Sequence, residues 1–166
     1  MIGFYPGSFD PVTRGHLDLV RRALAFCPRV VIGVGQNGGK NYLFSLEERK
    51  NMLAAALQDF LTEDEKARIA VHDFTGPTVD HAAQIGAGIL VKGLRNAADY
   101  AHEEQMVLVN RRLAPAIDTV FLFTENTLRD VSSSVVKEMA RAGIAGAKFE
   151  PYLTPEVRDA LLARVG

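Results

Sequence analysis

Short apolar runs alternate with longer amphipathic runs along the chain. Residues 30–34 (Val-Val-Ile-Gly-Val) and 89–91 (Ile-Leu-Val) are continuously apolar, a pattern typical of strands buried on both faces of a sheet. The β-branched and aromatic runs 2–5, 68–74 and 119–123 predict three more strands. We therefore predict about five short strands with longer segments between them.

The longer segments carry helical periodicity and end signals. Leu17, Val20 and Leu24 recur at helical spacing between arginines. The sequence Ser45-Leu46-Glu47-Glu48 is a capping box, which opens a helix that continues to Phe60. We predict further helices over residues 14–26, 78–87 with Thr78 as a cap, 98–113, 133–142 with Gly143 closing it, and from Thr154-Pro155 onwards.

Alternating strands and helices predict an α/β fold. Near-continuous apolar strands indicate parallel pairing, so we expect a doubly wound, Rossmann-like parallel sheet of about five strands with helices on both faces. Residues 1–166 show no linker or repeat, and we interpret them as one domain. Ligands of such sheets bind beyond the carboxyl ends of the strands. Segments 6–16, 36–41, 92–103 and 124–134 are therefore expected to share one crevice.

Composition and charge exclude several classes of protein. Of the 166 residues, 48% are apolar and 23% are charged, which excludes disorder, collagen and coiled coil as whole-chain structures. The formal net charge is −1, so no basic field favours nucleic acid. Cys27 is the only cysteine, which excludes an internal disulfide and favours a reducing compartment; we expect it to be packed rather than reactive. No apolar run approaches the ~20 residues of a membrane span, and the chain start lacks a signal-peptide pattern. We expect a soluble, cytoplasmic protein without a membrane partner.

The segment from Pro6 to His16 joins the first strand to the first helix. Gly7 and Gly15 allow close approach of a ligand to the backbone. His16 falls in the first turn of the helix, where free N–H groups and the helix dipole attract phosphate. Because the dipole disfavours imidazolium, we expect a neutral His16 that donates a hydrogen bond to phosphate. Spacing alone leaves open a histidine that merely packs or caps.

Two common nucleotide-binding motifs are missing. No G-x-G-x-x-G follows the first strand, which disfavours a dinucleotide fold of the dehydrogenase kind. The glycine-rich loop differs from a Walker A motif at Val34, where glycine is required, and at Asn41, where serine or threonine is required. We expect no protein-built metal site and only structural or surface roles for the remaining histidines, because no metal-ligand spacing relates His72, His81 and His102.

Three motifs together resemble a known family. Ser8-Phe9-Asp10-Pro11 with Thr13-x-Gly15-His16 is similar to the T/H-x-G-H signature of the nucleotidyltransferases. Lys92-Gly93-Leu94-Arg95, followed by Asp99-Tyr100 and Glu103, resembles the phosphopantetheine adenylyltransferases of that superfamily, as does Val131-Ser132-Ser133-Ser134-x-x-Lys137-Glu138. The resemblance covers nearly the whole chain, with the motifs in the family's order and spacing.

The resemblance implies an activity and its partners. The reaction is adenylyl transfer from ATP to 4′-phosphopantetheine, which gives dephospho-coenzyme A and pyrophosphate in coenzyme A biosynthesis. The family also implies Mg²⁺ carried with the ATP phosphates, feedback binding of coenzyme A, and a homohexamer. Two alternatives are another nucleotidyltransferase, acting on nicotinamide mononucleotide or a cytidylyl substrate, and a nucleotide-binding domain without catalysis.

The resemblance also implies roles for individual residues. It assigns catalysis to His16, at the α-phosphate, to Lys40 and Lys92, at the acceptor phosphate, and to Arg95, as a clamp on ATP. The residues implied to bind ATP are Ser8, Phe9, His16, Gly93, Leu94, Arg95, Glu103, Leu128, Arg129, Asp130, Val131, Ser132, Ser133 and Ser134. Those implied to bind the acceptor are Ser8, Lys40, Thr78 and Lys92. Without the resemblance, Lys40 reads as a solvated lysine, the serines as a helix cap, and Arg95 as an ion pair with Asp99.

The chain departs from the family pattern at three places. Ala101-His102 stands where the family usually has Glu-Tyr, Leu128-Arg129-Asp130 replaces an aromatic-rich stretch, and Asn41 follows Lys40 where a basic or small polar residue is common. We expect the first departure to change the packing around Glu103 and the second to change contacts with adenine or the γ-phosphate.

Overall fold

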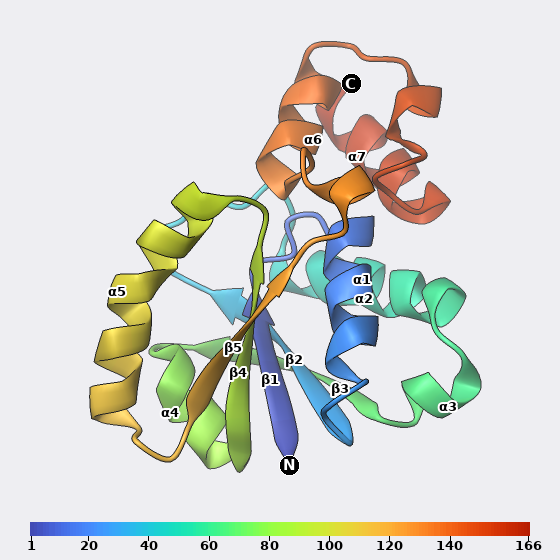
Figure 1. Ribbon diagram of the computed structural model, residues 1–166. Coiled ribbons are helices and arrows are strands. Elements are labelled where there is room, and N and C mark those ends of the chain that lie inside the picture. The colour runs from blue at the N-terminus through green and yellow to red at the C-terminus, as the bar shows by residue number, and fades with distance from the viewer.

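The sheet at the centre of the molecule has five parallel strands (Figure 1). A computed structural model describes residues 1–166 apart from the side chain of His102, so the expectation for that histidine lies outside the described residues. The spatial order is β3-β2-β1-β4-β5, and each neighbouring pair is parallel. The strands are β1 (Ile2–Gly7), β2 (Arg29–Gln36), β3 (Ile69–Thr75), β4 (Ala87–Leu94) and β5 (Asp118–Phe123). The predicted doubly wound sheet is therefore confirmed.

Helices cover both faces of this sheet. They are α1 (Arg14–Ala23), α2 (Leu46–Phe60), α3 (Glu63–Lys66), α4 (Thr78–Gln84), α5 (Ala97–Leu113), α6 (Ser133–Arg141) and α7 (Pro155–Val165), with 3₁₀ turns η1 (Asn126–Leu128) and η2 (Gly146–Phe149). Buried side chains of α1, α2, α6 and α7 share the larger core. Helix α4 packs in a smaller core on the opposite face, and α5 lies on that side as well (Figure 1). No helix in the described part of the chain is long and apolar enough to cross a membrane.

Alternation of side chains along the strands explains the continuous apolar runs. In β2, Ile32 contributes to the larger core and its neighbour Val31 to the smaller one. In β4, Val91 and Leu90 divide between the two cores in the same way. Each strand therefore needs apolar residues at consecutive positions, as expected for a sheet buried on both faces.

Some element boundaries differ from the predictions. Helix α1 ends at Ala23 instead of residue 26, because Pro28 disfavours helical backbone at the preceding residue and the last turn unwinds. Helix α4 ends at Gln84, since Gly86 turns the chain with a φ of +68°. The residues from Ala87 onwards pair with β1 instead, so β4 is longer than the predicted strand.

Local caps explain two further differences. The N-cap of α4 is Pro77, and Thr78 is the first helical residue, so the prediction that Thr78 caps this helix is wrong. Helix α3 was missed because four residues carry no apolar periodicity. It is held by a capping box, in which Thr62 and Glu65 exchange hydrogen bonds with each other's backbone.

The topology places the functional end of the sheet. Strand β1 lies between β2 and β4, so the connections leave it in opposite directions. The carboxyl ends of the strands lie below α6 and α7, at the end opposite the N-terminus (Figure 1). A crevice at such a reversal point is the usual ligand site of a doubly wound sheet.

Candidate functional site

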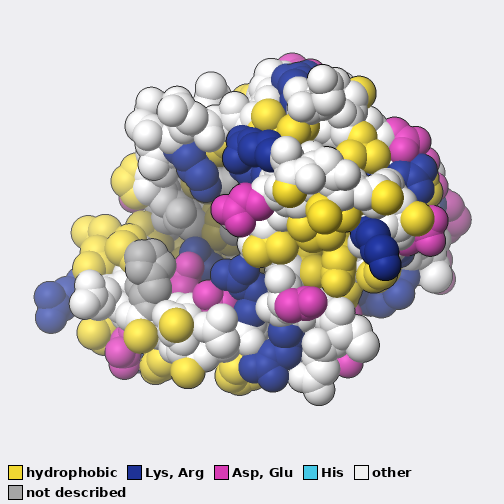
Figure 2. All heavy atoms as spheres, turned by 90° about the horizontal axis from the view of Figure 1, so that it is seen from above, with side chains coloured by type: hydrophobic (Ala, Val, Ile, Leu, Met, Phe, Trp, Pro, Cys, Tyr) yellow, Lys and Arg dark blue, Asp and Glu magenta, His cyan; other side chains and the backbone are white. Residues whose placement is uncertain are grey.

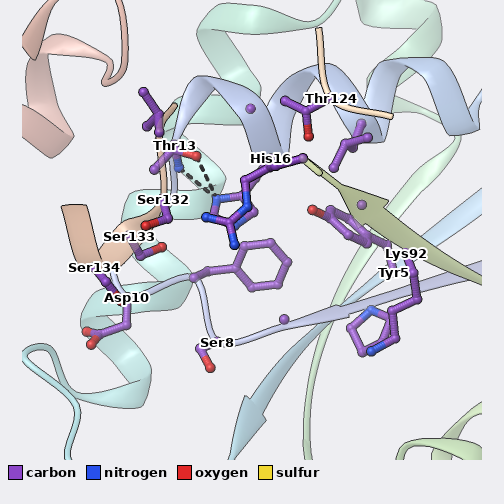
Figure 3. A pocket seen from close by; sticks show the side chains of 18 of the residues that line it. Tyr5, Ser8, Asp10, Thr13, His16, Lys92, Thr124, Ser132, Ser133 and Ser134 are labelled. Carbon is purple, nitrogen blue, oxygen red and sulfur yellow. Dashed lines mark hydrogen bonds between the residues drawn. The ribbon is translucent and has the colours of Figure 1, made fainter. Parts of the chain in front are cut away.

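A crevice of about 430 Å³ opens at the carboxyl ends of β1 and β4 (Figure 3). All four segments expected at this edge contribute to its lining. The predicted site residues that line it are Ser8, Phe9, His16, Lys40, Lys92, Gly93, Arg95, Glu103, Val131, Ser132, Ser133 and Ser134. Figure 2 looks onto this end of the molecule, where Lys and Arg side chains lie beside Asp and Glu side chains along a hollow.

Five predicted site residues do not line this crevice. Leu94 is 2% exposed and belongs to the interior. Leu128, Arg129 and Asp130 are also outside the lining, although the Arg129 guanidinium donates a hydrogen bond to the Arg95 carbonyl, with Nε 2.7 Å from the oxygen. Thr78 lies in a neighbouring cavity.

The neighbouring cavity is larger, at about 1000 Å³, and shares Lys92 and Glu103 with the crevice. Met106, Val109 and Leu113 of α5 form an apolar wall. The loop after β2 and the segment from Thr75 to Val79 form the opposite side. Two connected spaces, one polar and one partly apolar, therefore meet at the Lys92–Glu103 pair.

His16 is fixed at the start of α1. Thr13 is the N-cap, and its backbone N–H donates to Nδ1 of His16 across 2.9 Å, as the dashed line in Figure 3 marks. The Nδ1 atom is therefore an acceptor, and the proton of the neutral ring sits on Nε2. Burial, with a contribution from the Arg95 charge, lowers the pKa of His16 to about 4. The lowered pKa favours the neutral ring that we expect, and its main cause is burial rather than the helix dipole.

A tight turn at Phe9 shapes the floor of the crevice. Phe9 adopts a φ of +48°, which is rare for a residue with a side chain. Its buried ring packs against the His16 ring, with centroids 5.1 Å apart at 67°. A Cβ at Gly7 would come within 2.8 Å of the same ring, so only glycine fits there. This packing holds the imidazole from one side while Thr13 holds it from the other.

Asp10 connects three segments beneath the crevice. Its carboxylate, 2% exposed, accepts hydrogen bonds from the backbone N–H groups of Leu43 and Phe44, both at 3.0 Å, and from Lys137 Nζ at 2.8 Å. Burial opposes ionisation, but the Lys137 ammonium and the two N–H groups hold the pKa of Asp10 below its usual range. Sequence reasoning assigned neither Asp10 nor Lys137 a role, although both lie inside the quoted motifs.

The cations of the crevice each have a polar partner. Lys40 Nζ donates to the Ser8 hydroxyl across 2.9 Å. Lys92 Nζ lies 3.1 Å from a Glu103 carboxylate oxygen, and this pair is partly exposed. Arg95 makes a bidentate pair with Asp99, with both nitrogen–oxygen distances at 3.0 Å. The ion-pair alternative for Arg95 is therefore present, and it fixes the guanidinium beside the crevice.

The serines begin helix α6 at the rim of the crevice. Ser132 is the N-cap and accepts a hydrogen bond from the Val135 N–H, and Ser133 Oγ donates to the Pro11 carbonyl across 2.8 Å. The predicted helix start is confirmed, and the side chains act as a cap and a tether. The free N–H groups of the first turn remain available for an anion.

The other polar candidates lie away from the crevice. The rings of His72 and His81 lie 5.8 Å apart, and His81 packs against Phe4 and Phe74 on the smaller core. Cys27 is fully buried, as expected for a packed thiol. Among the described side chains, no group of three or more His, Cys, Asp or Glu residues is placed to hold a metal ion.

Comparisons with known proteins agree with this geometry. The model of the cytidylyltransferase-like family matches residues 4–139. The chain is 46% identical over 165 residues to phosphopantetheine adenylyltransferase of Dinoroseobacter shibae, which covers 99% of this chain and 94% of the relative. It is 46% identical to the protein of the same name in a Ruegeria species, with 99% and 98% coverage.

Solved structures share the fold at low sequence identity. Nicotinic acid mononucleotide adenylyltransferase of Plasmodium falciparum, complexed with NaAD, has a TM-score of 0.74 and 16% identity, and the match covers 98% of this chain and 94% of that one. A bifunctional NMN adenylyltransferase/ADP ribose pyrophosphatase of Francisella tularensis has a TM-score of 0.65 and 17% identity, with 98% and 52% coverage. These two likenesses show the Rossmann-like fold alone.

Proposed function

The chain belongs to the cytidylyltransferase-like family and, within it, to the phosphopantetheine adenylyltransferases, and from this premise we propose how its crevice works. The chain transfers an adenylyl group from ATP to 4′-phosphopantetheine in coenzyme A biosynthesis. The products are dephospho-coenzyme A and pyrophosphate. The reaction requires two anions to be held together, neutralised and aligned.

The observation that carries the assignment of the acceptor is the meeting of two unlike spaces at Lys92. The acceptor has a phosphate at one end and a long, mostly neutral arm. Lys92 and Lys40 line both the crevice and a smaller adjoining hollow that also includes Ser8 and Tyr42, so their charges suit the acceptor phosphate. The arm then extends along Met106 and Val109 of α5, and the Thr78 hydroxyl supplies a hydrogen bond to its amides.

The ATP side uses the starts of two helices. The N–H groups at the start of α6, with Ser132, Ser133 and Ser134, bind the β- and γ-phosphates. Arg95 moves part of its bidentate hydrogen bonding from Asp99 to the ATP phosphates. The Nε2–H of His16 donates to an α-phosphate oxygen.

The chemical step is an in-line displacement at the α-phosphorus. An acceptor phosphate oxygen forms the new bond to phosphorus, and the bond to the bridging oxygen breaks, so that pyrophosphate leaves with the electron pair. His16 strengthens its hydrogen bond as charge builds on the α-phosphate. Its ring cannot attack phosphorus, because Nε2 carries the proton and Nδ1 accepts from Thr13. His16 therefore carries no adenylyl intermediate, and the transfer in this scheme is direct.

Magnesium enters this scheme as part of the ATP substrate. The carboxylates that line the crevice, Asp10 and Glu103, each lie within 3.1 Å of a lysine nitrogen, so they suit charge pairing better than the binding of a resident ion. Mg²⁺ bound to the phosphate oxygens would neutralise charge on the leaving pyrophosphate. The donors of the chain then need only orient the phosphates.

We extend the family assignment to the oligomeric state, to feedback by coenzyme A and to the cellular location. Exposed apolar side chains on α5 and its surroundings, including Tyr100, Leu108 and Phe123, offer a surface for self-association, and the family implies that the assembly is a homohexamer. Coenzyme A carries the same pantetheine arm as the acceptor, so feedback binding would occupy the acceptor cavity. The use of ATP and the unpaired Cys27 support a cytoplasmic location.

Pyrophosphate release tests this assignment. Purified chain is incubated with Mg-ATP and, in separate reactions, with 4′-phosphopantetheine, pantetheine, nicotinamide mononucleotide or no acceptor, and CTP replaces ATP in a parallel series. We expect pyrophosphate release only in the reaction that contains both ATP and 4′-phosphopantetheine. Preferred turnover of another pair would indicate a different nucleotidyltransferase, and ATP binding without turnover would indicate a binding domain.

A further inference from the structure

Arg49 is a buried cation that the reaction scheme above does not use. It lies on α2 between Glu48 and Lys50, which are both partly exposed, yet it is only 1% exposed. No described carboxylate pairs with it, and its Nε has no hydrogen-bond partner. Burial of an unpaired charge is unfavourable. A residue retained in this state calls for an explanation beyond packing.

The Arg49 guanidinium joins the ends of two strands. Its Nη1 donates to the Ser8 carbonyl across 2.7 Å and to the Gly35 carbonyl across 2.9 Å. Ser8 directly follows β1, and Gly35 is the residue before the last of β2. One planar group therefore sets the spacing between the loop that carries Ser8 and the loop that follows β2.

The same guanidinium supports the Lys40 loop (residues 37–44). Its Cζ lies 4.1 Å from the centroid of the Tyr42 ring, a cation–π distance. The Tyr42 hydroxyl in turn accepts a hydrogen bond from the Asn37 N–H at 3.0 Å. Lys40 itself bonds to the Ser8 hydroxyl. Arg49 thus contacts the backbone of Ser8 directly and the loop of Lys40 through Tyr42.

We propose that Arg49 is a positioning residue for the acceptor phosphate, an inference that rests on the proposed assignment of Ser8 and Lys40 to the acceptor. It fixes the distance between these two side chains before the substrate arrives. Its uncompensated charge also adds to the positive potential under the loop. Ordering these groups in advance lowers the entropic cost of aligning the attacking oxygen.

Arginine suits this task better than lysine. Its Nη1 donates to both carbonyl oxygens while the face of the planar guanidinium lies against the Tyr42 ring. A lysine would keep the charge and its ammonium could reach a carbonyl, but it has no planar face to stack on Tyr42 and no rigid plane that fixes the direction of its donors. Arg49→Lys therefore separates the geometry of the group from its charge.

A purely structural role predicts a different result. If Arg49 only anchors α2, its substitution should lower thermal stability. It should also change the KM for ATP and the KM for the acceptor to a similar extent. A positioning role should raise the acceptor KM and lower kcat at a temperature where the protein is fully folded, while the ATP KM stays near its original value. The split between the two substrates is the decisive readout.

The test compares Arg49→Lys and Tyr42→Leu with Lys50→Met as the matched control. Lys50 is the next residue of the same helix and bonds to Glu47 and Asp73, away from the crevice. We expect kcat/KM for 4′-phosphopantetheine to fall about 10- to 100-fold in Arg49→Lys, to fall less in Tyr42→Leu, and to stay unchanged in the control. If Arg49→Lys does not fold, Tyr42→Leu still tests whether the contact between Arg49 and the Lys40 loop matters for acceptor kinetics. Wild-type acceptor kinetics in the folded variants, or equal changes for both substrates, would overturn the proposal.

Hydrogen exchange separates this proposal from the assignment of the reaction. Amide exchange of Ser8, Phe9 and the Lys40 loop is measured without substrates, so the readout does not depend on turnover. We expect faster exchange there in Arg49→Lys than in Lys50→Met. If the wild-type chain shows no turnover, the proposed reaction fails while this readout still stands. Unchanged exchange in these two segments would refute the positioning role itself.

Discussion

Replacement of His16 tests the proton placement in the crevice. The Thr13 N–H donates to Nδ1, so the donor available to substrate is Nε2–H. Three variants separate these two nitrogens. His16→Ala removes both, His16→Gln places an amide nitrogen near the position of Nε2, and His16→Asn places its amide near Nδ1, where Thr13 needs an acceptor.

The expected magnitude follows from one lost donor. Removal of a hydrogen bond that strengthens in the transition state costs about 10²–10³-fold in rate, or about 2.7–4 kcal/mol. His16→Ala should show this loss in kcat. Its ATP affinity should change little, because the bond is weak in the ground state. His16→Gln should recover part of the rate, and His16→Asn should resemble His16→Ala, since its amide oxygen turns to the Thr13 N–H and its nitrogen does not reach the α-phosphate.

Single-turnover rates with saturating Mg-ATP and 4′-phosphopantetheine measure the chemical step. Calorimetry with a non-hydrolysable ATP analogue measures binding separately, and thermal unfolding confirms that each variant is folded. A rate for His16→Asn equal to or above that of His16→Gln would refute the assigned tautomer. Near-normal turnover in His16→Ala would remove His16 from the mechanism.

Substitutions at three further residues test the neighbouring charges. Lys92→Met should raise the acceptor KM strongly and lower kcat with little change in the ATP KM, while Lys92→Arg retains activity; steady-state kinetics that leave the acceptor KM of Lys92→Met unchanged would assign the phosphate to Lys40. Arg95→Ala should weaken the binding of ATP more than the binding of the acceptor. Arg95→Lys should recover only part of this loss, because lysine lacks the bidentate fork. A change confined to the acceptor KM would show that Arg95 lies on the acceptor side of the site. Asp10→Asn should lower the free energy of unfolding at neutral pH by about 1.5–3 kcal/mol. Because the folded-state pKa of Asp10 is lowered, its stabilisation is present above its unfolded pKa of about 3.9 and is lost as pH falls through the lower folded value. Urea titrations should therefore show a flatter acid limb in Asp10→Asn, and an unchanged limb would contradict the account.

The sequence predicts the parts of this fold that depend on local pattern. Strands β2 and β4 are buried on both faces, so their apolar residues run without interruption and are visible in any window. The start of α2 is visible because Ser45 and Glu48 form a reciprocal cap. The crevice could be predicted because parallel strands end at the same edge, which brings distant loops together.

The interactions that organise the crevice could not be predicted in this way. Arg49 stands between charged neighbours on a helix, a pattern typical of an exposed face. Its burial depends on carbonyls that lie 41 and 14 residues away. The Asp10–Lys137 pair spans 127 residues. Such contacts exist only once the sheet has assembled, so no local window contains them.

Leu94 and Arg129 are two residues that the resemblance assigns to ATP but that lie outside the lining of the crevice. Leu94 packs in the interior, and Arg129 bonds to the Arg95 carbonyl. Leu94 continues β4 beyond the predicted strand, pairs with Phe123 of β5 and is buried there. Arg129 directly follows the 3₁₀ turn η1, an element that the sequence pattern did not predict.

Isotope exchange tests direct adenylyl transfer, the central claim, most plainly. The chain is incubated with Mg-ATP and labelled pyrophosphate, with and without 4′-phosphopantetheine, and incorporation of label into ATP is followed. In a direct displacement ATP can re-form only from dephospho-coenzyme A, so label should enter ATP only when the acceptor is present. Incorporation of label into ATP without acceptor would reveal an adenylylated protein intermediate and would contradict the account.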